Sequence, residues 1–164
     1  MAAVDYFLKL DGIEGESTAI KFEGAIDIES FSWGVTNSGR AVGAAGGGGG
    51  AGKASFQDMH FTTNVSKASP KLMLACATGE HIKSATLTGV LNKKAQLDFF
   101  TVKMTDLIVS SFQSGGTGGG EQIPEDQFSL NFGKIEFDYK PQSDTGALLE
   151  AIVAPVDLLR LAIT

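Results

Sequence analysis

The residues that most resemble a chemical motif are the glycine run and lysine "GGGGGAGK" at 46–53. From Gly47 to Lys53 the chain matches seven positions of the phosphate-binding template G-x-x-x-x-G-K-[ST]. The eighth position holds Ala54, where the template needs a hydroxyl group for the metal ion. A phosphate loop also needs a helix after it, whose first amides hold the phosphate, whereas "KASFQDMHFT" alternates like a strand. We therefore predict that this run binds no nucleotide.

The other residues with reactive side chains form no catalytic pattern. His60 and His81 lie in different segments, without metal-ligand spacing. Ser110 and Ser111 lack the G-x-S-x-G frame of an activated serine. Cys76 falls on the apolar side of an expected helix, which favours a packed thiol. The sequence thus predicts no catalytic residue, no cofactor and no metal site, and we expect the protein not to be an enzyme.

Length and composition indicate one globular domain over residues 1–164. Hydrophobic residues make up 43% of the chain and charged residues 20%. The net charge is −6 and the Lys and Arg residues are scattered, so we expect no nucleic-acid partner. No run approaches 18 apolar residues, and the N-terminus carries Asp5 but no basic region before an apolar run. We expect no membrane insertion, no cleaved signal peptide and folding in the cytoplasm.

Strand-like alternation dominates the chain, and one segment predicts a helix. Over about 69–78, Ser69 is expected to cap the helix, Pro70 to take its first position, and Gly79 to end it. Leu72, Met73 and Cys76 are expected to form its apolar stripe, and Trp33 to anchor the core or, as the alternative, a partner interface.

Many short strands with glycine-rich turns and one helix favour a mainly β barrel or sandwich. In "AIDIESFSWGV" the alternation slips by one residue, which predicts a β-bulge. The tail 143–164 is apolar at helical spacing, but Pro155 interrupts it and its structure stays open. A glycine-rich arm cannot fold alone, because ordering its backbone costs too much entropy without apolar burial, so a partner would have to order it.

Several segments in order resemble the haemolysin-coregulated protein (Hcp) family, the tube subunits of bacterial type VI secretion systems. The most specific are "GGGGGAGKASFQDMHFT" followed by "SKASPKLMLACATGEHI". "DGIEGES", "SFSWGVTNSG", "VSSFQSGGTGGGE" and "FSLNFGKIEFDYKPQ" extend the resemblance over about residues 3–142. It implies a β-barrel of two packed, antiparallel-rich sheets with a short flanking helix and a long Gly-rich extended loop at about 40–53.

The resemblance also implies a function. Homohexameric rings would stack head to tail into a tail tube that carries and chaperones effectors in its lumen, with a spike protein and sheath or baseplate proteins as further partners. The subunit would leave the bacterial cytoplasm through the type VI apparatus, into the medium or a target cell. The alternative is a ring-forming effector chaperone or secreted binding module that builds no tube.

The Gly-rich loop matches the extended family loop that reaches an adjacent ring. We expect the ring-stacking residues to be Arg40, Val42, Gly46, Gly47, Gly48, Gly49, Gly50 and Lys53. The tail departs from the family, whose members commonly end in a strand near a Gly-Trp-Asp motif that is missing here. A helix on the barrel, an adapted last strand or a group-specific interaction element stay open for 143–164.

Overall fold

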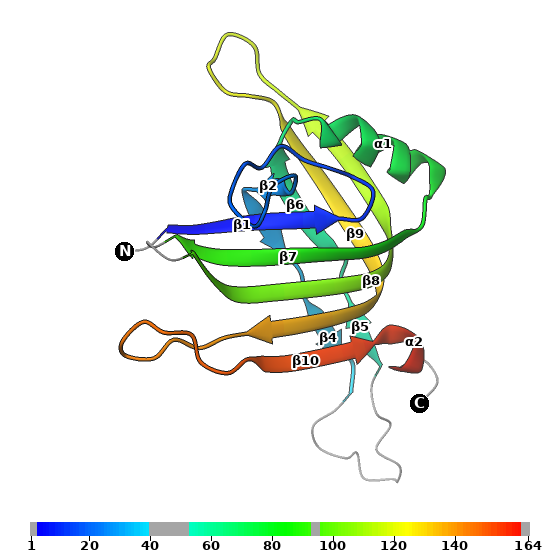
Figure 1. Ribbon diagram of the computed structural model, residues 1–164. Helices are drawn as coiled ribbons and strands as arrows, with labels where there is room; N and C mark the ends of the chain where they lie inside the picture. Colours follow the sequence, from blue (N-terminus) through cyan, green and yellow to red (C-terminus); the bar gives the residue numbers. More distant parts are fainter. Residues whose placement is uncertain (1–2, 40–52, 93–95, 162–164) are drawn as a thin grey trace.

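The computed structural model describes residues 3–39, 53–92 and 96–161, which form a β-barrel with a helix at one end (Figure 1). The elements of these residues are β1 (Ala3–Leu10), β2 (Ile26–Ile28), β3 (Ser30–Ser32), β4 (Val35–Asn37), β5 (Ala54–Phe56), β6 (Met59–Asn64), α1 (Ala68–Thr78), β7 (Ile82–Asn92), β8 (Gln96–Gly115), β9 (Glu125–Tyr139), β10 (Ile152–Asp157) and α2 (Leu158–Leu161).

The barrel is one curled, antiparallel sheet. Its strand order is β2-β1-β7-β8-β9-β6-β3, with β10 added to β9, and β4 and β5 pair separately. The mainly β barrel fold with few helices is confirmed, although its eight strands join in one sheet where the resemblance implied two.

One bent segment closes the barrel. β2 pairs with β1 and β3 pairs with β6, and only Glu29 separates β2 from β3. The Glu29 amide donates to the Thr62 carbonyl over 2.8 Å, and Thr63 Oγ1 donates to the Asp27 carbonyl over 2.6 Å. The predicted bulge is therefore wrong in kind: the slip in alternation marks the point where the chain changes its partner strand.

Apolar side chains from every side of the barrel fill one main core. Phe61 of β6 stacks on Phe128 of β9 with ring centroids 5.0 Å apart, and both side chains are buried. Removing such a side chain from water stabilises the fold by about 1.5–3 kcal/mol. The largest fully buried side chains are Phe61, Phe128, Leu8, Ile26, Met59, Leu72, Leu87, Met104, Leu107, Leu130, Val90 and Val102.

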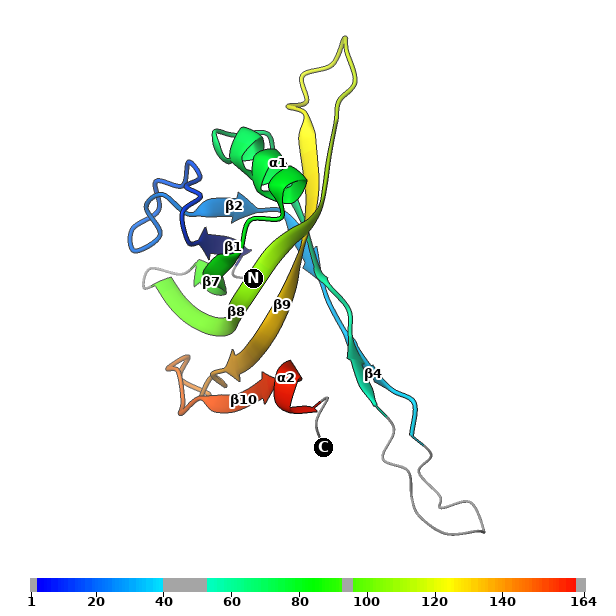
Figure 2. The same cartoon turned by 90° about the vertical axis from the view of Figure 1, so that its right-hand side faces the viewer.

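Helix α1 lies over one end of the barrel (Figures 1 and 2). Its extent agrees with the prediction, and Gly79 ends it with φ of 67°, a left-handed conformation that suits glycine. The predicted cap is wrong, because Lys67 is the N-cap residue and makes no side-chain cap. Ser69 lies inside the helix, where its hydroxyl donates to the buried Asp126 carboxylate. The helix is thus joined to β9 by a polar contact as well as by its apolar face.

The C-terminal tail contributes a strand to the sheet. β10 runs antiparallel to β9, from Ile152 opposite Tyr139 to Asp157 opposite Lys134. Pro155 fits this position because, among the described residues, β9 is the one strand that pairs with β10, so no amide is needed on the other edge of β10. An adapted last strand is therefore the correct alternative for this part of the tail.

Candidate functional site

A two-stranded ribbon of β4 and β5 projects from the barrel and is the most distinctive surface feature of the chain (Figure 2). Val35 pairs with Phe56 and Asn37 with Ala54. Val35 is 50% exposed, although valine favours half-buried sheet surfaces. The ribbon follows the β3–β6 pair along the same hairpin, and Phe56 of β5 is packed against the main core.

The ribbon carries the predicted glycine loop. Lys53, the one predicted loop residue that the structure describes, is exposed and directly precedes β5. A strand therefore follows the lysine, as the alternation predicts, and no helix N-terminus stands there to hold a phosphate. The other predicted ring-stacking residues lie outside the described residues; these are Arg40, Val42, Gly46, Gly47, Gly48, Gly49 and Gly50.

The four predicted anchors lie in different surroundings. Leu72 is fully buried, and Cys76 is partly buried against the same core. The prediction for Met73 is wrong: its side chain is 53% exposed, because the buried face of α1 runs through Leu72 and Ala75 instead. Trp33 is partly buried, with its ring 5.6 Å from that of Phe137.

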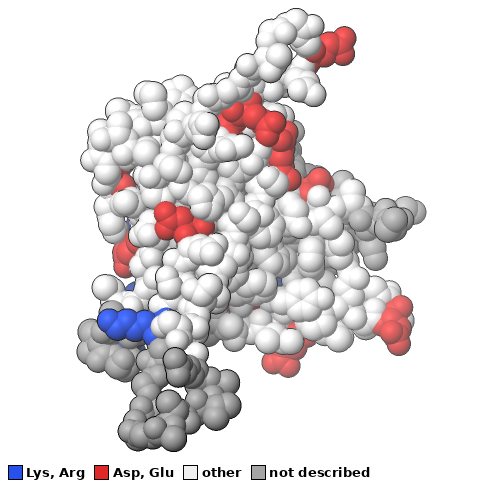
Figure 3. Space-filling model, turned by 180° about the vertical axis from the view of Figure 1, so that it is seen from behind, with Lys and Arg blue, Asp and Glu red and all other residues white. Residues whose placement is uncertain are grey.

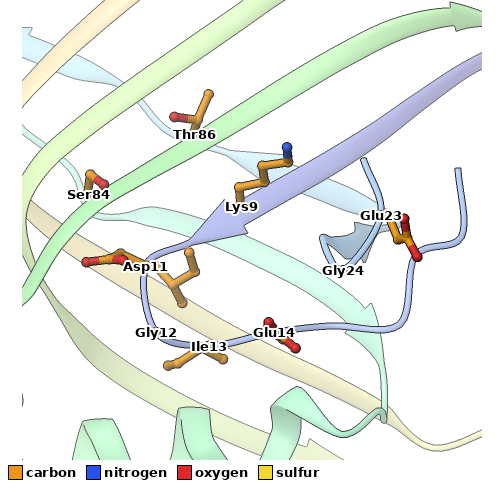
Figure 4. Close-up of a pocket in the computed structure, with 10 residues that line it drawn as sticks. Lys9, Asp11, Gly12, Ile13, Glu14, Glu23, Gly24, Ser84 and Thr86 are labelled. Atoms are coloured by element: carbon orange, nitrogen blue, oxygen red, sulfur yellow. The ribbon is translucent and has the colours of Figure 1, made fainter. Parts of the chain in front are cut away.

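A shallow hollow of about 420 Å³ lies beside β1, β7 and the loop after β1 (Figure 4). Its carboxylates, Asp11, Glu14 and Glu23, are spread around the hollow and do not converge. Lys9 Nζ donates to the Lys21 carbonyl over 3.1 Å, so that Lys9 is held against the loop. Within residues 3–39, 53–92 and 96–161, no three His, Cys, Asp or Glu side chains are placed to hold a metal ion.

The charges do not form a nucleic-acid footprint on the face seen in Figure 3. Asp and Glu groups are scattered over it, and Lys and Arg groups appear mainly at the lower left. A nucleic-acid surface would gather basic groups in a stripe or patch. None of the helices in the described part of the chain is long and apolar enough to cross a membrane.

The outer edge of the sheet at β10 is apolar and exposed. Ile152 is 65% exposed and Val153 50%, and Leu159 of α2 continues this surface. Within residues 3–39, 53–92 and 96–161, no strand pairs with the outer edge of β10. Natural proteins commonly cover such an apolar edge by association with another chain. Sequence reasoning missed this surface, because the tail was too ambiguous to place its strand.

Comparison with known proteins agrees on one family. The family model described as type VI secretion system effector, Hcp, matches residues 7–139. The protein Hcp1 of Pseudomonas aeruginosa is 38% identical over 146 residues, which cover 88% of each chain.

Solved structures agree with the sequence comparison. A structure described as a type six secretion system protein superposes with a TM-score of 0.89 and 28% identity, over 96% of this chain and 98% of the other. Hcp1 from Salmonella typhimurium gives a TM-score of 0.75 and 29% identity, over 98% and 97% of the two chains. A type VI secretion system effector from Yersinia pestis gives 0.73 and 31%, over 93% and 99%.

Proposed function

The chain belongs to the Hcp family and is a subunit of the type VI secretion tube, and from this premise we propose that its copies close into hexameric rings that stack head to tail. Family membership favours the tube subunit over a chaperone or binding module that builds no tube. The tube lumen would carry effector proteins, and the ends and outside of the tube would meet the spike, sheath and baseplate proteins.

The projecting ribbon of β4 and β5 is the observation that carries this proposal. It projects from the barrel, Phe56 at its root is packed against the main core, and it leads directly into the glycine run. A two-stranded ribbon is only marginally stable in water by itself. Contact with a subunit of the next ring would order it, and glycine would let the two backbones approach closely.

The edge strand β10 supports closure within one ring. A head-to-tail ring needs two different surfaces on each subunit that fit each other. The exposed apolar residues of β10 and α2 would supply one of them, because burying Ile152 and Val153 against a neighbour removes apolar area from water. We assign the role of a non-enzymatic structural subunit to the chain, exported through the type VI apparatus from the cytoplasm without a cleaved signal.

Deletion of Gly46–Gly50 tests the stacking role. Light scattering after size exclusion should give wild-type rings a mass near six times 17.1 kDa, and electron microscopy should show tubes at high concentration. The deletion variant should keep the ring mass and lose the tubes. Intact tubes from this variant would refute the role of the glycine run, and a monomer mass for the wild type across concentrations would refute the ring.

A further inference from the structure

The hairpin that carries the ribbon has an irregular root. Ser32 pairs with His60 and Val35 pairs with Phe56. Two residues therefore separate the paired positions on one strand, 33 and 34, and three separate them on the other, 57–59. One extra residue on one strand is a β-bulge, which bends a ribbon and increases its twist. The direction in which the ribbon leaves the barrel is thus set at 57–59.

A second bulge lies across β9 from the first. In the β8–β9 pair, Val109 is opposite Leu130 and Ser111 is opposite Ser129, so Ser110 is the extra residue. On the other edge of β9, Leu130 pairs with Met59 at the start of β6. The two bulges therefore lie at the same level of β9, on its two sides.

The carboxylate of Asp58 connects these two irregular points. Its Oδ2 accepts a hydrogen bond from Ser110 Oγ over 2.7 Å, and its Oδ1 accepts one from Asn131 Nδ2 over 2.8 Å. Both oxygens are thus used, one by the bulge of β8 and one by β9 itself.

This cluster is structural in its chemistry. The Ser110 hydroxyl donates to one oxygen of the Asp58 carboxylate and Asn131 donates to the other, so both oxygens link segments of the chain. Ser129 completes the cluster, because its hydroxyl lies 2.7 Å from that of Ser110 and is also hydrogen-bonded to that of Ser111. Strands β8 and β9 and the connection between β5 and β6 are joined in this way at one level of the barrel.

The root has a second point of attachment on its apolar side. The Phe56 ring packs edge to face on Phe132, with centroids 6.2 Å apart. The Gln57 amide donates to the Gly34 carbonyl over 2.9 Å, which keeps the two strands together at the bend. One point of attachment would leave a hinge, but an apolar contact at Phe56 and a polar one at Asp58 fix an angle.

We propose that Asp58 is a positioning residue that sets the angle between the β4–β5 ribbon and the barrel, by bridging the bulge at 57–59 to Ser110 and Asn131. Its consequence for assembly rests on the proposed function, since the ribbon would have to point at the next ring for stacking. The angle itself belongs to the single subunit and is measured without any stacking.

Pulsed EPR distance measurement on spin labels tests the angle. One label goes on the ribbon at Thr36→Cys and one on the barrel at Lys83→Cys, both exposed positions, in a Cys76→Ser background. The chain with the two new cysteines is co-expressed with an excess of the Cys76→Ser chain, and the purified mixture is then labelled. Most rings then hold at most one labelled chain, so distances within one subunit dominate. With Asp58 present, the distribution of label-to-label distances should be narrow. In Asp58→Ala its width should grow about twofold, or its mean distance should change, because the ribbon is held at one point instead of two.

Two further variants separate positioning from general damage. Asp58→Asn should restore the narrow distribution, because its amide oxygen accepts from Asn131 and its amide group donates to Ser110. Ser111→Ala is the matched control: it removes a hydroxyl from the same bulge that bonds to Ser129, not to Asp58, and should leave the distribution unchanged. If Asp58→Ala does not fold, Ser110→Ala and Asn131→Ala each remove one of the two bonds and should each broaden the distribution.

An unchanged distribution in Asp58→Ala, or in both single-bond variants if Asp58→Ala does not fold, overturns the positioning role. A broadened distribution with at least tenfold fewer tubes, and rings of normal mass, supports it together with the stacking function. A broadened distribution with undiminished tubes supports the positioning role and contradicts the stacking function of the ribbon.

Discussion

The inner and outer halves of one hairpin differ in what stabilises them. In the inner half, β3 pairs with β6, and β6 buries Met59 and Phe61 in the core while also pairing with β9. In the outer half, β5 is the one strand of the described part of the chain that pairs with β4, and Val35 is half exposed. The inner half depends on burial within the subunit, whereas the outer half keeps its apolar and backbone groups available to another molecule. The difference shows how one hairpin can contribute to the fold at one end and to assembly at the other.

Phe61→Ala is expected to have the largest effect on this comparison. It removes a fully buried ring that stacks on Phe128, so the free energy of unfolding should fall by about 3–5 kcal/mol. Denaturant unfolding at one fixed subunit concentration measures it, since association also stabilises the subunit. Val35→Ala in the outer half is the control and should change the free energy by less than about 1 kcal/mol. Equal losses for the two variants would remove the distinction between the halves.

Phe56→Ala tests the junction between the two halves. Phe56 is half-buried and contacts Phe132, so its loss should cost about 1–2 kcal/mol, between the losses expected for Phe61→Ala and Val35→Ala. The same unfolding experiment measures the change. If the free energy of unfolding fell as much as in Phe61→Ala, Phe56 would behave as a core residue. If it did not fall at all, Phe56 would behave like the exposed residues of the outer half.

Asp27→Asn should give the smallest effect, at the start of the bent segment that leads into this hairpin. Although the Asp27 residue is largely exposed, partial removal of its carboxyl from water raises the pKa of that carboxyl, and the charge of Asp5 raises this pKa further. A raised pKa in the folded state means that the protonated form favours folding. This contribution is complete below the unfolded pKa and is lost as pH rises through the folded pKa.

The Asp27 carboxylate should therefore weaken the fold slightly at neutral pH, and the effect is small because the side chain is exposed. Asp27→Asn should raise the free energy of unfolding relative to the wild type more at pH 7 than at pH 3.5, as measured by denaturant unfolding at both values. A difference that shrinks as pH rises would contradict a raised pKa for Asp27 in the folded state.

Local sequence patterns correctly predicted those elements that depend on neighbouring residues alone, such as a regular alternation along a strand or a glycine at the end of a helix. The helix ends at Gly79 because the left-handed backbone conformation there suits glycine, and buried and more exposed side chains alternate along β6. The errors arose where distant residues decide. Ser69 has the chemistry of a cap, but Asp126, far along the chain, takes its hydroxyl. Met73 fits an apolar stripe, but the direction of the barrel under α1 selects Ala75.

Some residues of the proposed assembly surfaces could be predicted from the sequence and others could not. The glycine run could be located, and a strand after Lys53 could be predicted, because both are local. Asp58 could not be singled out, because its partners Ser110 and Asn131 lie far away in the sequence and its role depends on two bulges in register. The strand β10 was also hidden, since helical spacing in 143–164 competes with the pairing that β9 offers.

Two different strands, β6 and β10, pair with successive parts of one edge of β9. Each of the two pairings could be broken without breaking the other. β6 covers the edge from Glu125 to Leu130, and β10 covers it from Lys134 to Tyr139. β6 pairs with both β9 and β3, whereas β9 is the one strand of the described residues that pairs with β10, which exposes most of its side chains and packs Val156 against the core. We therefore expect β10 to detach at a lower free-energy cost than global unfolding. A strand that exchanges between attached and detached states would allow a subunit edge to be rearranged while the barrel stays intact.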